Sequence, residues 1–363
     1  MSLDYKRPDY YTTAIRQEAS FQTAFCVQSE NDDADDECGD NEQPLGIRLH
    51  GGPQLNAQGY TGRGIKVAVI DNGIDGSHPL FHGKVTGGFK YRYGNRGEDH
   101  GTHVAGAIHM MAPEAELRDY RVFGPEGELG TVQSIANAIM DAYLDGCDLI
   151  NLSIGSKRAD AAIMNAIQYV QRKGVVLVAA ASNFGDGDVL TNERAYPACF
   201  EETISIAAVK KEHDLPVVKS SNSNPSVDYA GIGDRVRSFQ AGSHGYTNLT
   251  GTSMACPHIC GLIAALMSGP NASKFRRKEG RDAKVRELLK QYTLDIACEG
   301  FDNATGLGFV TFLSRSEFNN MFGNKRSSRT SPSPLPPHRF RAPAVSSQHK
   351  DEKHPRKPLK MWA

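Results

Sequence analysis

Short, continuous runs of apolar residues recur along the chain and predict strands that are buried on both faces, as in a parallel sheet. Five such runs cover residues 65–70, 117–123, 149–154, 175–181 and 204–209. Between them, apolar residues recur at helical spacing over residues 132–144 and 161–172, and a further helix is expected over residues 253–267. Strands that alternate with helices indicate βαβ units. We therefore predict an α/β fold of three layers, in which a mostly parallel central sheet carries helices on both faces.

The two ends of the chain lack this pattern, so three regions are expected. Residues 1–43 form an N-terminal extension with an acidic run at residues 30–37, which we expect to be partly disordered. Residues 44–322 carry the α/β pattern and form the folded domain. Residues 323–363 are basic and rich in Pro and Ser. We expect this tail to be disordered, with a docking or nucleic-acid role as the lesser alternative.

Composition narrows the class of protein without revealing its chemistry. The 363 residues carry a formal net charge of −1, so nothing in the overall charge points to nucleic acid. No apolar run reaches the roughly 18 residues that a membrane-spanning helix needs. The N-terminus lacks the apolar core of a secretory signal, so we expect an intracellular protein or an N-terminally incomplete secreted precursor. The seven cysteines show no disulfide-scaffold spacing, and Cys256 and Cys260 are expected to be small buried side chains.

Three polar motifs interrupt the apolar framework and together provide an acid, a base and a nucleophile. Asp71 directly follows the run at residues 65–70, His100 opens the segment His-Gly-Thr-His-Val-Ala-Gly, and Ser253 lies in Gly-Thr-Ser-Met-Ala. Alone, an Asp in a turn is usually a turn former, and a Ser at a helix start is usually an N-cap. The chain order Asp, His, Ser is one of three orders in which catalytic triads with a serine nucleophile occur.

On these motifs, residues 44–322 resemble the subtilisin-like serine peptidases. The resemblance implies a subtilisin-like fold in which Asp71 orients His100, His100 acts as the general base, and Ser253 attacks the peptide carbonyl. The implied activity is that of a serine endopeptidase that works through an acyl-enzyme and needs no organic cofactor.

Two further histidines lie beside these motifs. His103 follows His100 by three residues and is the alternative base, whereas His258 lies on the same predicted helix as Ser253. The resemblance places the base on the first His of His-Gly-Thr-His, so we expect His103 and His258 to be structural.

The resemblance also implies residues that bind the substrate. The oxyanion hole would consist of the backbone N–H of Ser253 and the side-chain amide of Asn183, which could otherwise be a loop-capping amide. Ser182 stands where the family usually has Gly, a departure that could shift the local backbone. An extended peptide would pair as an added strand with two segments of the domain. These segments contribute Ser153, Ile154 and Gly155 on one side and Gly127 on the other.

The first specificity pocket departs from the family pattern in a second place. Ala195 replaces a usual Gly at the rear of the pocket, and Phe184 gives its rim an apolar residue. We therefore expect cleavage after medium apolar residues such as Leu and Met rather than after Trp, and poor cleavage after Lys or Arg. The alternative is that Ala195 only packs the loop and leaves specificity unchanged.

The calcium site that family members usually carry is expected to be absent. The ligand loop is missing, because residues 106–111 run directly into residues 112–114, and Leu80 stands at the position of a partner Asp. We expect no cofactor or metal. Polypeptide substrates are the expected partners, with no nucleic acid and no membrane, and the protein is expected to be a monomer. The N-terminal extension is either a short inhibitory segment or remnant sequence.

Two rival functions remain open at this point. A specialised processing peptidase of the same fold would cleave one partner only. An inactive binding module would keep the fold without the chemistry, yet Asp71, His100, Asn183 and Ser253 are all present.

Overall fold

The structure is a computed structural model that describes residues 22–23, 27–28, 43–91, 99–124 and 130–322. These described residues all belong to one structural unit. The predicted basic tail at residues 323–363 and most of the predicted N-terminal extension lie outside the described residues.

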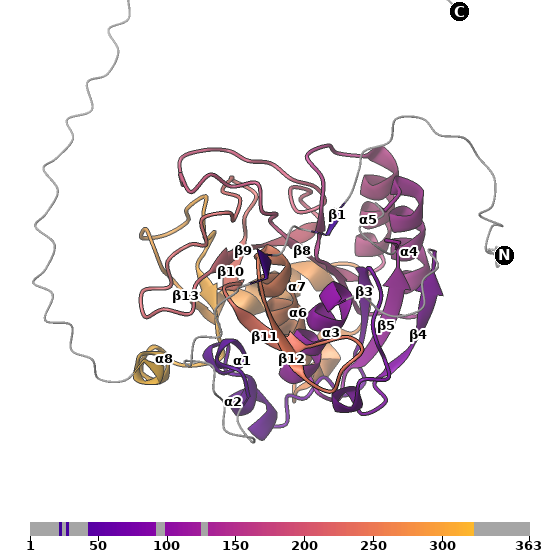
Figure 1. Cartoon of the computed structure of the whole chain (residues 1–363), viewed down its shortest axis with the longest axis horizontal. Helices are drawn as coiled ribbons and strands as arrows, with labels where there is room; N and C mark the ends of the chain where they lie inside the picture. The colour runs from indigo at the N-terminus through magenta and orange to yellow at the C-terminus, as the bar shows by residue number, and fades with distance from the viewer. Residues whose placement is uncertain (1–21, 24–26, 29–42, 92–98, 125–129, 323–363) are drawn as a thin grey trace, which may run out of the picture. The chain divides into compact units, whose positions relative to one another are not determined.

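A central sheet runs through the domain (Figure 1). Its strands are β3 (Lys66–Asp71), β4 (Val85–Lys90), β5 (Glu116–Arg121), β6 (Leu149–Leu152), β8 (Val176–Ala180), β9 (Thr203–Val209), β10 (Tyr229–Ile232), β13 (Thr293–Leu294) and β14 (Phe309–Val310). Within the described residues the sheet has nine strands, in the order β13-β14-β10-β9-β8-β6-β3-β5-β4. All neighbours pair in parallel except β13 and β14. The predicted α/β fold with a mostly parallel sheet is confirmed.

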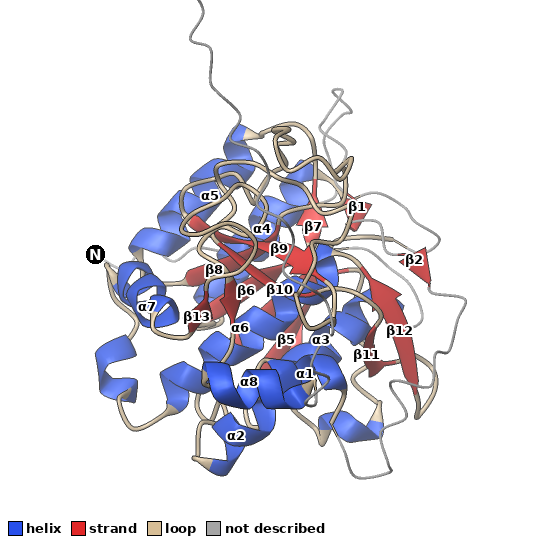
Figure 2. Cartoon of the chain, turned by 90° about the vertical axis from the view of Figure 1, so that its left-hand side faces the viewer, coloured by secondary structure: helices blue, strands red, loops and turns tan. Residues whose placement is uncertain are grey.

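Helices surround this sheet (Figure 2). They are α1 (Leu45–Leu49), α2 (Gly52–Ala57), α3 (Asp99–Met111), α4 (Val132–Leu144), α5 (Ala161–Arg172), α6 (Thr252–Ser268), α7 (Arg281–Lys290) and α8 (Arg315–Met321). Helices α4 and α5 begin and end at the predicted residues, because polar caps precede their amphipathic stretches. Thr131 Oγ1 accepts from the N–H of Ser134, and Asp160 Oδ1 accepts from the N–H of Ala162 over 2.8 Å.

The side chains of one strand divide the core into two layers. Val67 and Val69 of β3 belong to the cluster that contains α3 and α6 residues, whereas Ala68 and Ile70 belong to the cluster that contains α4 and α5 residues. Successive side chains on a strand point to opposite faces of a sheet. Helices therefore cover both faces, which explains why the strands read as continuous apolar runs rather than as alternating ones.

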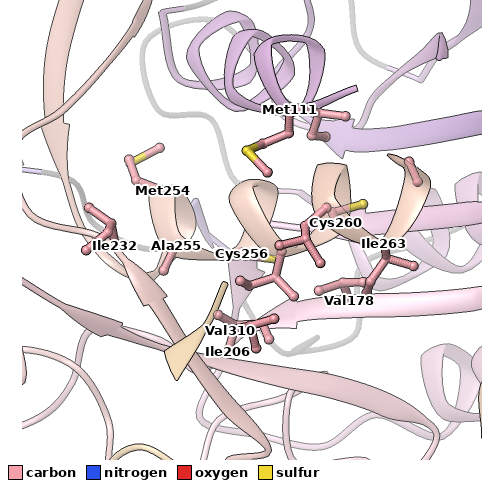
Figure 3. Packing of buried hydrophobic residues seen from close by; sticks show 14 of the residues in the cluster. Met111, Val178, Ile206, Ile232, Met254, Ala255, Cys256, Cys260, Ile263 and Val310 are labelled. Carbon is pink, nitrogen blue, oxygen red and sulfur yellow. The ribbon is translucent and has the colours of Figure 1, made fainter. Parts of the chain in front are cut away.

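Helix α6 crosses the core as an almost entirely buried helix (Figure 3). Residues 252–267 of this helix are all buried, so it carries no polar stripe. Cys256 and Cys260 lie among apolar side chains in Figure 3, are fully buried and form no disulfide. Burial raises the pKa of both thiols. The prediction of small buried side chains is confirmed for this pair.

Two small sheets lie outside the central one, and sequence patterning did not predict them. The first pairs β11 (Val236–Phe239) with β12 (Tyr246–Thr250), and β12 in turn with β2 (Val27–Gln28). The second pairs β7 (Ile154–Gly155) with β1 (Gln22–Thr23). The strand expected over residues 149–154 is thus wrong in its extent. It divides into β6, which stays in the central sheet, and β7, which leaves that sheet to pair with the N-terminal segment.

Candidate active site

Asp71 and His100 meet where the first of the predicted strands ends. Asp71 is the last residue of β3 and His100 lies in the first turn of α3. His100 Nδ1 donates to Asp71 Oδ1 over 2.8 Å, and the same oxygen accepts from the N–H of Asn72 over 2.8 Å. Asp71 is fully buried. A buried carboxylate that accepts the Nδ1 proton holds an imidazole in one orientation with Nε2 directed away from the acid.

The glycine after His100 allows this approach of helix to strand. A β-carbon on Gly101 would stand 2.2 Å from the carbonyl oxygen of Gly73. The N–H of Gly101 instead donates to Asn72 Oδ1 over 2.8 Å. The start of α3 therefore packs directly on the turn that follows Asp71, which explains why this motif needs Gly beside its His.

Ser253 is the second residue of α6, at the end where helix N–H groups favour negative charge. Its side chain is buried, and its Oγ lies 3.4 Å from the carbonyl oxygen of Ser153. Ser153 in turn donates from its Oγ to the carbonyl oxygen of Ser253 over 2.9 Å. The nucleophile candidate is thus joined to the segment between β6 and β7, one hundred residues earlier in the chain.

Asn151 supports this connection from inside the sheet. Its Nδ2 donates to Ser153 Oγ over 2.9 Å, and its Oδ1 accepts from Cys256 Sγ at 3.3 Å. Asn151 and Ser153 are fully buried. Sequence reasoning missed Asn151, although an amide inside the apolar run Leu-Ile-Asn-Leu is a signal, because a buried amide requires partners.

Asn183 follows β8 and is held by the residue before Ser253. Asn183 Oδ1 accepts from the N–H of Thr252 over 2.9 Å and from Thr252 Oγ1 over 3.0 Å. These two bonds leave the Nδ2 group of the same amide on the side of Gly251, where an added β-carbon would be 2.8 Å from Nδ2. Gly251 has a φ of 156°. The amide donor therefore lies next to the start of α6, where the substrate carbonyl would be attacked.

The other two histidines make contacts that favour structural roles. His103 is buried and donates from Nε2 to the carbonyl oxygen of Val236 over 2.7 Å, and burial lowers the pKa of His103 to about 3. His258 donates from Nδ1 to the carbonyl oxygen of Met254 over 2.8 Å, and burial lowers its pKa to about 4. Both rings therefore remain neutral and tie α3 and α6 to their surroundings.

Two parts of the predicted substrate site carry a paired strand. In the β1–β7 pair, Gln22 lies opposite Gly155 and Thr23 opposite Ile154, and the strands are antiparallel. In the β2–β12 pair, Val27 lies opposite Thr250, which is three residues before Ser253. The N-terminal segment thus adds strands on both sides of Ser253. Gly127, predicted on the facing edge, lies outside the described residues.

The remaining pocket candidates lie together beside Asn183. Ala195 is buried, and the ammonium of Lys157 lies 4.7 Å from the centre of the Phe184 ring. Ser182 has a φ of +87°, a conformation that glycine adopts easily. The expected shift of the backbone at Ser182 does not take the form of a switch to ordinary φ. Instead this serine adopts the glycine-like geometry, at a cost on the order of 1–3 kcal/mol.

Leu80, at the expected calcium position, lies in a short 3₁₀ helix (Pro79–Phe81) and packs against the core. In the described ranges, no group of three or more His, Cys, Asp or Glu side chains is placed to hold a metal ion. The prediction of a missing calcium site remains a prediction.

Comparison with known proteins identifies relatives of this chain. The sequence model of the subtilase family matches residues 62–324. The major intracellular serine protease of Bacillus subtilis (strain 168) is 35% identical over 295 residues, which cover 76% of this chain and 90% of that protein. An intracellular serine protease of Paenibacillus polymyxa is 31% identical over 303 residues, covering 79% of this chain and 90% of that protein.

A solved structure shares the fold. Fervidolysin from Fervidobacterium pennivorans, described as a keratinolytic enzyme related to subtilisin, superposes with a TM-score of 0.67 at 24% identity. The match covers 83% of this chain and 51% of that one, so this chain spans about half the length of fervidolysin. At this level of identity, the likeness supports the fold alone.

Proposed function

This chain belongs to the subtilase family and is a subtilisin-like serine endopeptidase, and we propose that it hydrolyses peptide bonds through an acyl-enzyme formed on Ser253. The single observation that carries the proposal is the 2.8 Å hydrogen bond from His100 Nδ1 to the buried Asp71. The order of the three residues along the chain and the position of Ser253 at the start of α6 support it.

The proposed mechanism assigns one step to each group. His100 Nε2 takes the proton from Ser253 Oγ as this oxygen attacks the peptide carbonyl carbon, and Asp71 stabilises the imidazolium that forms. The backbone N–H of Ser253 and Asn183 Nδ2 stabilise the negative oxygen of the tetrahedral intermediate. His100 then returns the proton to the leaving amine. Water hydrolyses the ester with the same base, which regenerates the Ser253 hydroxyl.

A fluorophosphonate probe tests the proposal directly, because only an activated serine oxygen displaces its fluoride under mild conditions. We expect the full-length chain to be labelled on Ser253 and Ser253→Ala to remain unlabelled, as read by gel fluorescence and peptide mapping. Heat-denatured wild type is the control for chemistry that depends on the fold. Labelling at another serine, or equal labelling of Ser253→Ala, would show that the nucleophile is misassigned.

The substrate is proposed to be an extended polypeptide that binds as an added strand. The pairing of β1 with β7 and of β2 with β12 supports this mode, because these strands show that both edges accept a further strand. A groove that takes a strand on both sides of Ser253 favours cleavage within a chain over cleavage at its end. Among side chains before the scissile bond, Ala195 would limit large ones, and the Lys157 cation would disfavour Lys and Arg.

The N-terminal segment is proposed to block this groove. Because β1 and β2 occupy the edges where a substrate would pair, removing residues 1–42 should raise kcat/KM for a small fluorogenic peptide. We expect a gain of about tenfold or more, since only molecules with an open groove can bind the peptide. The matched control removes residues 330–363 and should leave kcat/KM unchanged. Equal activity of the full-length chain and the N-terminal deletion would instead identify the extension as remnant sequence.

No metal or organic cofactor is proposed for the reaction, since the three catalytic candidates provide acid, base and nucleophile. The rate of fluorophosphonate labelling should therefore be the same with and without EDTA. A slower rate in EDTA would point to a structural ion.

We further propose that the protein acts inside the cell, as a monomer. Two relatives are named as intracellular proteases, which supports this location. Within the described residues, no helix is both long and apolar enough to cross a membrane.

A further inference from the structure

Ser182 lies between the two walls of the proposed specificity pocket. It follows β8 and directly precedes Asn183, and its N–H donates to Thr252 Oγ1 over 3.1 Å. Its side chain faces the opposite wall, because its Oγ is 2.5 Å from where a β-carbon on Gly155 would stand. Only glycine at position 155 leaves room for this hydroxyl, so the two walls meet at Ser182.

The backbone at Ser182 is held in a conformation that disfavours any side chain. Its φ of +87° lies in the left-handed region. The bond to Thr252 holds one side of this peptide, and the N–H of Asn222 donates to the carbonyl oxygen of Ser182 over 3.0 Å on the other. Glycine would adopt this geometry without strain. A strained serine beside a catalytic candidate is a feature typical of ligand sites, where surrounding structure enforces the conformation.

The hydroxyl of Ser182 is buried without a bonding partner. The residue is 0% exposed, and its Oγ has no hydrogen-bond partner among the residues that the structure describes. An unsatisfied buried hydroxyl is unfavourable, so a ligand group that bonds to it restores what burial removed. Ser182 is thus a polar point in a pocket whose rim, at Phe184, was expected to be apolar.

We propose that Ser182 is a specificity-determining residue, whose hydroxyl forms a hydrogen bond with the side chain of the substrate residue before the scissile bond. The proposal rests on the endopeptidase function above and names the side chains that this site prefers. A hydroxyl both donates and accepts, as does the carboxamide of Asn or Gln. Because Ala195 closes the rear of the proposed pocket, a carboxamide of medium length fits best. The hydroxyl thus raises cleavage after Asn and Gln relative to Leu and Met.

Two matched peptide pairs test this role. The fluorogenic peptides differ only in the residue before the scissile bond, Asn against Leu and Gln against Met, which are nearly equal in size. The quantity measured is the ratio of kcat/KM for the polar and apolar members, in full-length wild type, Ser182→Ala and Ser182→Gly. Ser182→Ala keeps the β-carbon and the strained backbone and removes only the hydroxyl. We expect it to lower both ratios about fivefold, the value of one uncharged hydrogen bond.

The glycine variant separates the hydroxyl from the bulk of the side chain. Ser182→Gly should lower the ratios as Ser182→Ala does, and in addition should raise cleavage after Phe, because it opens the pocket. Ratios that stay at the wild-type value in Ser182→Ala would overturn the proposal and leave Ser182 a packing residue. An equal loss for both members of each pair would do the same.

The design distinguishes failure of this inference from failure of the function itself. Titration with a fluorophosphonate counts the active sites in each preparation, so a folding defect cannot imitate a change in the ratio. Wild type that neither reacts with the probe nor cleaves any peptide would refute the endopeptidase proposal. Active wild type with ratios that Ser182→Ala leaves unchanged would refute only the role of Ser182.

Discussion

Replacing Ser253 or His100 by alanine is expected to lower kcat by about four orders of magnitude or more while the chain stays folded. Ser253→Ala removes the attacking oxygen, and His100→Ala removes the base that is bonded to Asp71 over 2.8 Å. Turnover of a fluorogenic peptide measures the loss. Circular dichroism and the melting temperature show whether each variant has kept its fold.

The double variant reveals whether the two residues act as a unit. Once the nucleophile is gone, a base that activates it has nothing left to do, so the losses should not add. We expect the double variant to be no slower than the slower single variant. A much slower double variant would mean that one of the two residues works outside the triad.

His103 provides the control within the same motif. Its imidazole bonds to the carbonyl oxygen of Val236, so His103→Ala should lower the melting temperature while kcat per titrated active site stays close to wild type. A loss of kcat as large as that of His100→Ala would transfer the role of base to His103.

The second large effect is expected at Asn183. Asn183→Ala should lower kcat about 10²–10³-fold with little change in KM, because the donor serves the intermediate more than the bound substrate; this size is that known for the subtilisin donor and does not derive from the present geometry. Thr252 holds the amide oxygen of Asn183 through two bonds of 2.9 and 3.0 Å. The donor is therefore oriented before the substrate arrives.

Asn183→Asp distinguishes an oxyanion donor from a loop cap. A carboxylate still accepts from the N–H of Thr252, so a loop-capping role would survive this change. It cannot donate, and its charge would repel the negative oxygen of the intermediate. We expect kcat to fall at least as far as in Asn183→Ala. Near wild-type kcat in Asn183→Asp would establish the capping role instead.

The sequence predicted the elements whose burial is simple. Strands β3, β8 and β9 are covered by helices on both faces, so their apolar runs are continuous and easily recognised. The bounds of α4 and α5 were predictable because a polar cap and an amphipathic repeat coincide at each start.

Other elements could not be read from local pattern. Strand β4 contains Gly87 and Gly88 and forms an edge of the central sheet, where burial is incomplete and the apolar signal is weak. Strand β7 continues the apolar run of β6 and separates from it only because it pairs with β1. The pairing partner decides such strands, and a short window of sequence does not contain that partner.

By itself, the sequence determined the α/β class, the order Asp71, His100, Ser253 and the segments that surround them, because local apolar pattern and short motifs carry this information. Only the tertiary structure decided how the candidates are held: Asn183 by Thr252, Ser253 by Ser153 and Asn151, and Ser182 in a glycine-like backbone against Gly155. It also placed β1 and β2 along the edges that flank Ser253. The physical reason is that these bonds join residues tens to hundreds of positions apart, so packing of the whole domain must bring both partners together before either has its role.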